Sequence, residues 1–466
     1  MIERLENPVF RQSSRQRMRG ARTYGCLMAY LLALGLVVVI SYDQFMAVGV
    51  RRSTAGLAQT LFETLVATQW FLVAFITPAL TTSAITMERE QRTYDLLIMT
   101  PLSRFAIVWG KFVSALAFVV VMILCGMPLV AVLFLMGGVD TGLMLERYAG
   151  MLITGALLAA FGLMMSAICS NTTVANVLTY GILASVYFAG VVFGIAFVMS
   201  RAFGGASVST FWPGLGLNSW QFWLLTAVSV LLTLAILLQV AANYLLPDAR
   251  QGAWKTRLLT ALLHLSSLFA AVLTAKRTVF LFPVPHYLAI TTVASLATIA
   301  LFVSTGVPLR GRRWWQWLDP RSLKVGTVQS ALLYLLLLLL AGVIADLFLP
   351  AKMRSGPVVW FYLAGYVWWI WALGYFVSVV VRNRWGALFL LVGMLYLFVQ
   401  MVYNLAVFSD RRDDWLFLLN FSAPAELFRD DRSFALWGIA YVALGLTAAG
   451  LGWLIHRKRE RAQAGA

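Results

Sequence analysis

Charged residues are scarce in this sequence. They occupy 12% of its 466 positions, whereas hydrophobic residues occupy 61%, and the mean hydropathy is +0.83. A typical soluble domain has about 25% charged residues. A chain this apolar could not cover its own surface in water, so we predict that its solvent is lipid. In lipid the backbone must satisfy its own hydrogen bonds, which favours a polytopic, all-α membrane protein.

Cysteine and histidine are also rare, with three of each. Cys26, Cys125 and Cys169 lie within apolar stretches, which argues against a disulfide framework and against a metal site. The histidines are far apart in sequence, and no HExxH, GxSxG or GxxxxGK[ST] motif occurs. We therefore predict that the chain is not an enzyme, holds no cofactor of its own and cannot hydrolyse ATP by itself.

The N-terminal segment does not have the pattern of a cleavable signal peptide. Six arginines lie within its first 22 residues, and the apolar run that follows is long enough to span a bilayer. We predict that residues 1–23 form an amphipathic helix on the cytoplasmic membrane surface. A solvated basic tail is the alternative.

Long apolar stretches are the main feature of the sequence. A membrane span needs roughly 20 mostly apolar residues. The seventh predicted span is the weakest, because it is short and contains His264. Twelve spans are predicted, at about 24–42, 62–86, 105–136, 147–169, 173–199, 220–246, 258–275, 286–305, 327–349, 358–381, 386–408 and 434–455.

The basic residues test this arrangement. With the N-terminus in the cytoplasm, the cytoplasmic segments hold 24 of the 36 Lys and Arg residues. This agrees with the positive-inside rule and places both termini in the cytoplasm, in a plasma (inner) membrane. The same distribution of basic residues accounts for the net charge of +17, so we predict no nucleic-acid partner.

Titratable residues within the predicted spans are few. Glu63 and Asp346 lie near span ends, and His264 is the third such residue. We expect these groups to reach interfacial water. Their scarcity argues against a proton-coupled secondary transporter, which needs a titratable relay near the midplane.

The loop after the second span is the most informative segment. Charged residues come first, an apolar run with Met99 follows, and Thr100 and Pro101 suit the start of the next helix. We predict a short helix at about 87–100. It is either a docking helix or a simple interfacial connector.

This segment resembles the signature of type-2 ABC exporter permeases. The resemblance implies a coupling helix that fits a groove of a separate cytosolic ATPase subunit, which would bind the ATP and magnesium. Arg92 stands where many family members have glycine, so the helix here is expected to start differently. The positions that match the family pattern are Glu88, Glu90, Thr93, Leu96, Leu97, Thr100 and Pro101.

The chain is predicted to consist of two six-span halves. Residues 24–246 form the permease domain with the coupling helix, and residues 247–466 form a degenerate repeat without it. An offset of 212 residues gives seven identities over the 22 positions from Gly162 to Leu183. The basic, tryptophan-rich segment 310–319 of the second half is expected to anchor at the interface.

These features predict the permease subunit of an ATP-driven ABC exporter. Its expected partners are a cytosolic ABC ATPase, membrane lipids and a second half of the pathway, supplied by a homodimer or by a pseudo-dimer within the chain. The alternatives are an ion-gradient-driven secondary transporter, a polytopic membrane enzyme acting on lipid-linked substrates, and a non-transporting sensor or scaffold.

Overall fold

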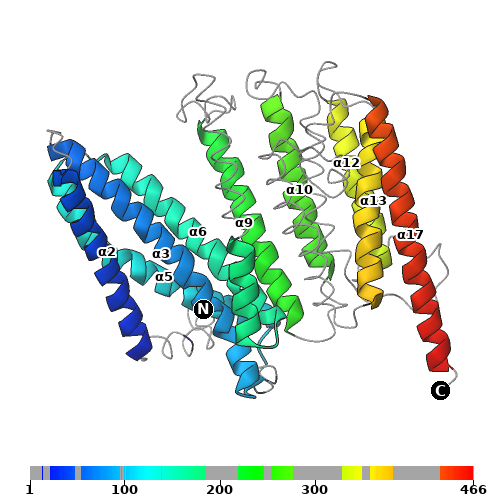
Figure 1. The fold of residues 1–466 in the computed structure, drawn as a ribbon, viewed down its shortest axis with the longest axis horizontal. Helices are drawn as coiled ribbons and strands as arrows, with labels where there is room; N and C mark the ends of the chain where they lie inside the picture. The colour runs from blue at the N-terminus through cyan, green and yellow to red at the C-terminus, as the bar shows by residue number, and fades with distance from the viewer. Residues whose placement is uncertain are drawn as a thin grey trace. The chain divides into compact units, whose positions relative to one another are not determined.

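The structure is a computed structural model of the chain. Every described secondary-structure element is a helix, and no strand occurs among the described residues (Figure 1). The chain divides into two compact units, the first made of Met1–Gly181 and Thr233–Pro247 and the second of Ile182–Leu232 and Asp248–Ala466. The structure describes residues 13, 21–47, 54–94, 96, 99, 101–137, 139–184, 219–245, 253–275, 328–348, 357–380 and 431–464.

The first unit is a bundle of long apolar helices. Its helices α2, α3, α5 and α6 pack against one another around a shared apolar core that includes Leu34, Leu65, Met122 and Met151. A shorter helix, Thr172–Ala184, follows α6. The four long helices are α2 (Ala21–Ala47), α3 (Thr54–Glu90), α5 (Arg104–Leu135) and α6 (Thr141–Ile168).

Helix α3 is longer than a membrane span requires. Its 37 residues correspond to about 55 Å at a rise of about 1.5 Å per residue, whereas a hydrocarbon core is about 30 Å thick. The last turns of α3, which carry Met87 to Glu90, can therefore extend beyond the lipid. This length positions the candidate site described below.

Helix α3 also contains Pro78 in its interior, which lacks a backbone donor. Close to it, the Tyr180 hydroxyl donates to the Phe75 carbonyl at 2.6 Å. Gly162 of α6 lies against this region, and a side chain there would meet Thr81 and the Pro78 backbone.

Four described helices lie wholly within the second unit and contact one another in chain order. Its core is rich in aromatic residues, and Tyr441 of α17 packs edge-on against Tyr362 and Tyr366 of α13. Gly445 and Gly452 allow the α13 aromatic side chains to approach the α17 backbone. The helices are α10 (Ala253–Ala275), α12 (Val328–Leu347), α13 (Pro357–Val380) and α17 (Asp431–Ala464).

The predicted spans agree with the described helices where the two can be compared. By length and composition, seven described helices could cross a membrane, and one of them lies within α9 (Ser219–Tyr244). Helix α10 coincides with the predicted seventh span but is not one of these seven. The predicted spans 286–305 and 386–408, and nearly all of the predicted helix at 1–23, lie outside the described residues. The chain is a multi-pass membrane protein, and the count of twelve stays a prediction.

Two titratable side chains in the second unit are buried, so the prediction that they reach interfacial water is wrong. His264 is 0% exposed, and its Nε2 lies 3.3 Å from the Leu338 carbonyl oxygen of α12. Asp346 is 3% exposed and accepts a hydrogen bond from Trp360 Nε1 at 3.1 Å. Glu63 of the first unit is exposed, and whether it reaches interfacial water stays a prediction. Packing between neighbouring helices encloses the two groups, and sequence position alone does not report it.

Candidate functional site

The candidate site begins where α3 ends. The Arg92 amide donates to the Arg89 carbonyl at 3.1 Å, and the Thr93 amide donates to the Glu88 carbonyl at 2.9 Å. This pair of bonds is the Schellman arrangement that closes many helices, and it requires a left-handed residue at the position of Arg92. Arg92 has a φ of 58°, the conformation that glycine adopts most easily.

The boundaries of the predicted short helix change accordingly. Helix α3 continues to Glu90, so the predicted start at about residue 87 falls inside α3. The next long helix, α5, begins at Arg104 and not at Thr100, and its N-cap is Ser103, whose side chain accepts from the Ala106 amide at 3.2 Å. Serine is among the best N-cap residues, so it serves in place of the predicted threonine. We call the connection between α3 and α5, residues 91–103, the docking loop.

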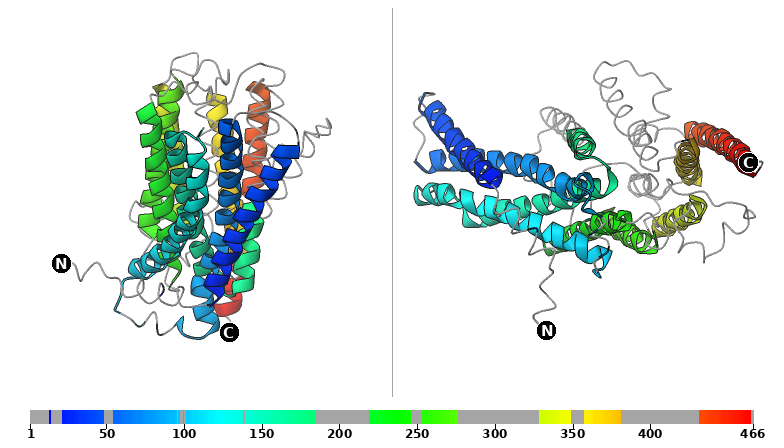
Figure 2. Two further views of the ribbon diagram at one scale, coloured as in Figure 1. Left: turned by 90° about the vertical axis from the view of Figure 1, so that its left-hand side faces the viewer. Right: turned by 90° about the horizontal axis from the view of Figure 1, so that it is seen from below.

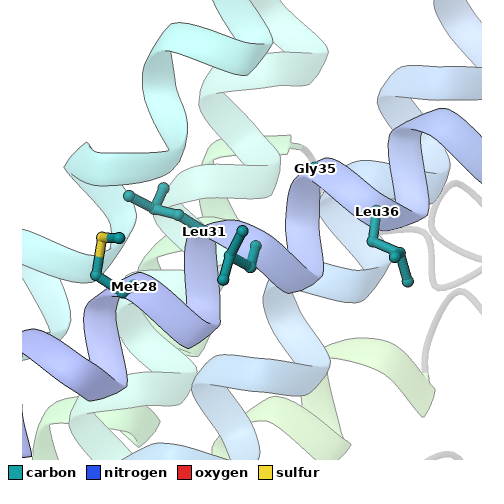
Figure 3. A pocket seen from close by; sticks show the side chains of 5 residues that line it. Met28, Leu31, Gly35 and Leu36 are labelled. Atoms are coloured by element: carbon teal, nitrogen blue, oxygen red, sulfur yellow. The ribbon is translucent and has the colours of Figure 1, made fainter.

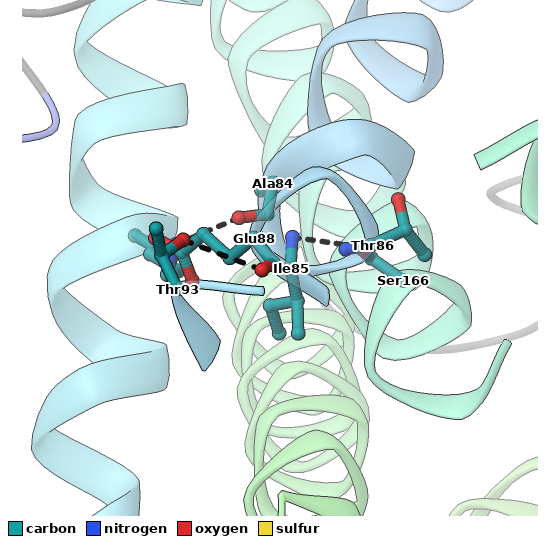
Figure 4. Close-up of polar contacts among 7 residues, drawn as sticks. Ala84, Ile85, Thr86, Glu88, Thr93 and Ser166 are labelled. Atoms are coloured by element: carbon teal, nitrogen blue, oxygen red, sulfur yellow. Dashed lines mark hydrogen bonds and ion pairs between the residues drawn. The ribbon is translucent and has the colours of Figure 1, made fainter. Parts of the chain in front are cut away.

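Glu88 forms an ion pair with Lys111 of α5. The Lys111 Nζ lies 2.7 Å from Glu88 Oε1 and also donates to the Ala84 carbonyl at 2.7 Å. The Lys111 side chain is 5% exposed, and that of Glu88 is 30% exposed. Figure 4 shows Glu88 with Ala84 and Thr93 at this end of α3. Glu88 therefore joins two helices and is turned toward the bundle.

Arg89 binds the end of α6. Its guanidinium donates through Nη1 to the Cys169 carbonyl at 2.7 Å and through Nη2 to the Ala167 carbonyl at 2.8 Å. The same guanidinium lies 4.8 Å from the centre of the Tyr94 ring, within cation–π distance. The Tyr94 hydroxyl donates to the Leu245 carbonyl just after α9. One arginine thus connects α3, the docking loop and the end of α6.

Glu90 binds the beginning of the next helix. Its Oε1 accepts from the backbone amide of Thr172 at 2.7 Å, where the helix Thr172–Ala184 starts. The Thr172 hydroxyl also donates to the Thr86 hydroxyl at 2.9 Å. Ser166 of α6 accepts from the Ile85 amide at 2.8 Å and the Thr86 amide at 3.1 Å (Figure 4). The last two turns of α3 are therefore joined to the turn that follows α6.

Cys169 lies in that turn and is buried. Burial raises the pKa of its thiol to about 11, while the nearby Arg89 guanidinium opposes the shift. The thiol is therefore protonated at neutral pH. A buried, protonated thiol is a poor nucleophile, so Cys169 is not a candidate catalytic residue.

The docking loop exposes apolar side chains. Leu96 is 68% exposed and Met99 is 81% exposed, and Met87 at the end of α3 is 45% exposed. Thr93 and Pro101 are exposed as well. These five side chains are accessible around the end of α3 and along the docking loop.

The predicted site residues thus separate into two groups. Glu88 and Glu90 contact neighbouring helices, although Glu90 is itself exposed, whereas Thr93 and Leu96 are exposed on the loop. Leu97 and Thr100 lie outside the described residues. The sequence analysis missed the roles of Arg89, Tyr94, Lys111, Ser166 and Thr172. A lysine within an otherwise apolar helix was the one available signal, because such a charge needs a partner.

Other candidate sites in the described part of the chain have little chemistry. No group of three or more His, Cys, Asp or Glu residues there could hold a metal ion. A hollow of about 360 Å³ on α2 is lined by apolar residues and one glycine (Figure 3). Its lining residues are Met28, Leu31, Leu32, Gly35 and Leu36. A hollow without polar groups on one membrane helix is an ordinary lipid-facing surface.

Comparison with known families gives one match. Residues 8–209 match the model of a family described as ABC-2 family transporter protein. The matched residues include α2, α3, α5 and α6, and hence the docking loop and its contacts with α6. No curated protein and no solved structure matches the chain.

Proposed function

We propose, from the match of residues 8–209 to the ABC-2 family transporter protein model, that this chain is the permease subunit of an ATP-driven exporter of that family. The chain is a multi-pass integral membrane protein, and the family match supports a role in transmembrane transport. The proposal adds the direction of transport, a separate cytosolic ATPase and its docking at the loop between α3 and α5. ATP and magnesium would bind to that ATPase and not to this chain.

The observation that carries the proposal is the exposed apolar surface of the docking loop. Leu96 and Met99 are exposed in a loop that follows a helix end held by partly buried polar contacts. Interface hot spots are large side chains at the centre of a contact, and support that is already in place reduces the conformational entropy lost on binding. A loop that only connected two spans would not need this anchoring.

The contacts at the base of the loop also suggest how a movement of the loop would be transmitted to the membrane-spanning helices. Glu88 ties the base of the loop to α5 through Lys111, so a displacement of the loop would move α3 and α5 together. ATP binding would close two ATPase subunits, and the bundle would respond as a two-state element. We propose a homodimer, because two ATPase subunits would each need one docking loop. A pseudo-dimer of the two halves is the alternative.

Co-purification tests the proposal. A candidate ATPase subunit is co-expressed with the wild-type chain or with Leu96→Asp, and the membrane complex is isolated in detergent. A charge in the centre of the contact is expected to reduce bound ATPase by roughly ten-fold or more. Leu145→Asp is the matched control, because Leu145 is 70% exposed and lies in the first turns of α6, at the predicted external end.

Two results would contradict the proposal. One is the absence of ATPase from the wild-type preparation. The other is an equal loss of ATPase in the Leu96 and Leu145 variants, since this would report general damage and not a docking surface.

A further inference from the structure

The end of α3 carries two adjacent charges that bind two consecutive pieces of the chain. Arg89 binds carbonyl groups at the end of α6, and Glu90 binds an amide at the start of the helix Thr172–Ala184. The turn between those helices, residues 169–172, is about 80 residues from α3 in the sequence. We call the four residues Arg89, Glu90, Cys169 and Thr172 the turn clamp.

Each charge of the turn clamp matches the helix end that it binds. Carbonyl groups at a helix C-terminus carry partial negative charge, which favours the Arg89 guanidinium. Amide groups at a helix N-terminus carry partial positive charge, which favours the Glu90 carboxylate. Both contacts are charge-assisted hydrogen bonds of 2.7–2.8 Å, the stronger class in proteins.

The geometry of Arg89 makes this contact directional. A planar guanidinium that donates to two carbonyl groups and also faces an aromatic ring has little freedom to rotate. The ring belongs to Tyr94 in the docking loop, 4.8 Å from the guanidinium carbon. A movement of Tyr94 would therefore displace Arg89, and Arg89 would displace the end of α6.

We propose that the turn clamp transmits movement of the docking loop to α6 and to the helix Thr172–Ala184. This inference rests on the proposed function, since it requires an ATPase that moves the loop. In this inference Arg89 and Glu90 act as positioning residues. The helices that move with the loop are then α6 and the helix Thr172–Ala184, in addition to α3 and α5.

Cys169 provides a direct probe of the turn clamp. Its carbonyl is an acceptor for Arg89, its thiol is buried, and the pKa of that thiol is about 11. Both burial and protonation slow alkylation, so a small displacement of the turn would change the reaction rate. In a background with Cys26→Ser and Cys125→Ser, Cys169 is the single thiol.

The experiment measures the initial rate of Cys169 alkylation by iodoacetamide at pH 8.5. The complex with the ATPase is compared without nucleotide and with ATP, magnesium and vanadate. In the wild-type background we expect the rate to change by about five-fold or more, the lower range of typical coupling between sites. Arg89→Lys keeps the positive charge, but a lysine cannot donate to both carbonyl groups and also stack on the Tyr94 ring. In this variant the nucleotide-dependent change in the alkylation rate is expected to be lost.

Two control comparisons separate transmission from general stability. Arg92→Lys makes the same substitution at an exposed residue three positions away, and it is expected to keep the nucleotide-dependent change. Glu90→Gln retains an oxygen that can accept from the Thr172 amide and should keep part of the change, whereas Glu90→Ala should lose it. All these variants are expected to retain bound ATPase, because none removes an exposed apolar group of the docking loop.

The outcomes distinguish the inference from the function on which it rests. If no ATPase co-purifies with the wild type, the proposed function fails and the inference fails with it. If the ATPase is bound but nucleotide leaves the Cys169 rate unchanged, the inference alone is overturned. The same holds if Arg89→Lys and Glu90→Ala respond to nucleotide as the wild type does.

Discussion

Arg92 carries an unfavourable backbone conformation at the start of the docking loop. A non-glycine residue in the left-handed region costs roughly 1–2 kcal/mol. The sequence analysis singled out Arg92 because the family resemblance implies a glycine there in many members, and a φ of 58° is a conformation that glycine adopts easily. The Schellman bonds of Arg92 and Thr93 show that this turn forms with an arginine at the left-handed position.

We predict that Arg92→Gly stabilises the protein. The gain should be about 0.5–1 kcal/mol, because relief of strain is partly offset by the greater freedom of glycine in the unfolded chain. The measurement is the free energy of unfolding of the detergent-solubilised chain in a denaturant titration. Arg92→Ala retains the strain and should give no such gain, and a loss of stability in Arg92→Gly would contradict the explanation.

The ion pair between Glu88 and Lys111 gives a second prediction at this scale. Lys111→Met would leave a half-buried carboxylate without its partner and should destabilise the chain by about 2–3 kcal/mol, less than for a fully buried pair. Adding Glu88→Leu to Lys111→Met should recover most of that loss, because no unpaired charge remains.

A double-mutant cycle of unfolding free energies checks this prediction. The cycle needs the wild type, the two single variants and the double variant. A coupling energy below about 0.5 kcal/mol would mean that the two side chains act independently.

At the scale of helices, the contact between α3 and α6 determines how the site is assembled. Ser166 accepts from backbone amides of α3, and Gly162, one turn earlier, lies against Thr81 and Pro78. Small residues at such contacts let membrane helices approach closely. This closeness brings the end of α6 within reach of Arg89.

We predict that Gly162→Leu separates α3 from α6. Its side chain would meet Thr81 and the backbone of Pro78, so we expect destabilisation of about 1–3 kcal/mol, the usual cost of overpacking. Faster alkylation of Cys169 should accompany it, because the clamped turn would loosen. Gly181→Leu is the matched control, since a Cβ atom added there would meet no other atom within 4 Å beyond the backbone around it. Equal effects of the two variants would contradict the prediction.

At the scale of the whole molecule, the described helix ends bear on the predicted repeat at one place. Helices α5 and α12 end at Leu135 and Leu347, which are 212 residues apart, the offset of the predicted repeat. One shared boundary does not test the repeat, which stays a prediction.

Membrane topology provides a prediction for the entire chain. With all native cysteines replaced by serine, a single cysteine at Ala464 should react with a membrane-impermeant maleimide only from the cytoplasmic side. A single cysteine at Asp140, between α5 and α6, should react only from outside. The physical reason is the excess of basic residues in the predicted cytoplasmic segments. Labelling of both positions from the same side would contradict the predicted topology.

The sequence by itself determined the class of the protein and the positions of most described helices. Long apolar runs such as 105–136 and 147–169 coincide with α5 and α6 within a few residues at each end, because hydrophobicity is a local property of the chain. The sequence also located the connection between the second and third predicted spans, because charge is equally local, but it misplaced the boundaries, since α3 continues to Glu90 and α5 is capped by Ser103. Docking at this loop stays a proposal.

Only the tertiary structure decided which side chains anchor that loop. Glu88 and Lys111 are 23 residues apart, and Arg89 and Cys169 are 80 residues apart. Such pairs depend on how each helix is rotated and how closely it packs, and no local pattern records either. Glu88 was therefore predicted as a docking residue, although its side chain pairs with Lys111 inside the bundle.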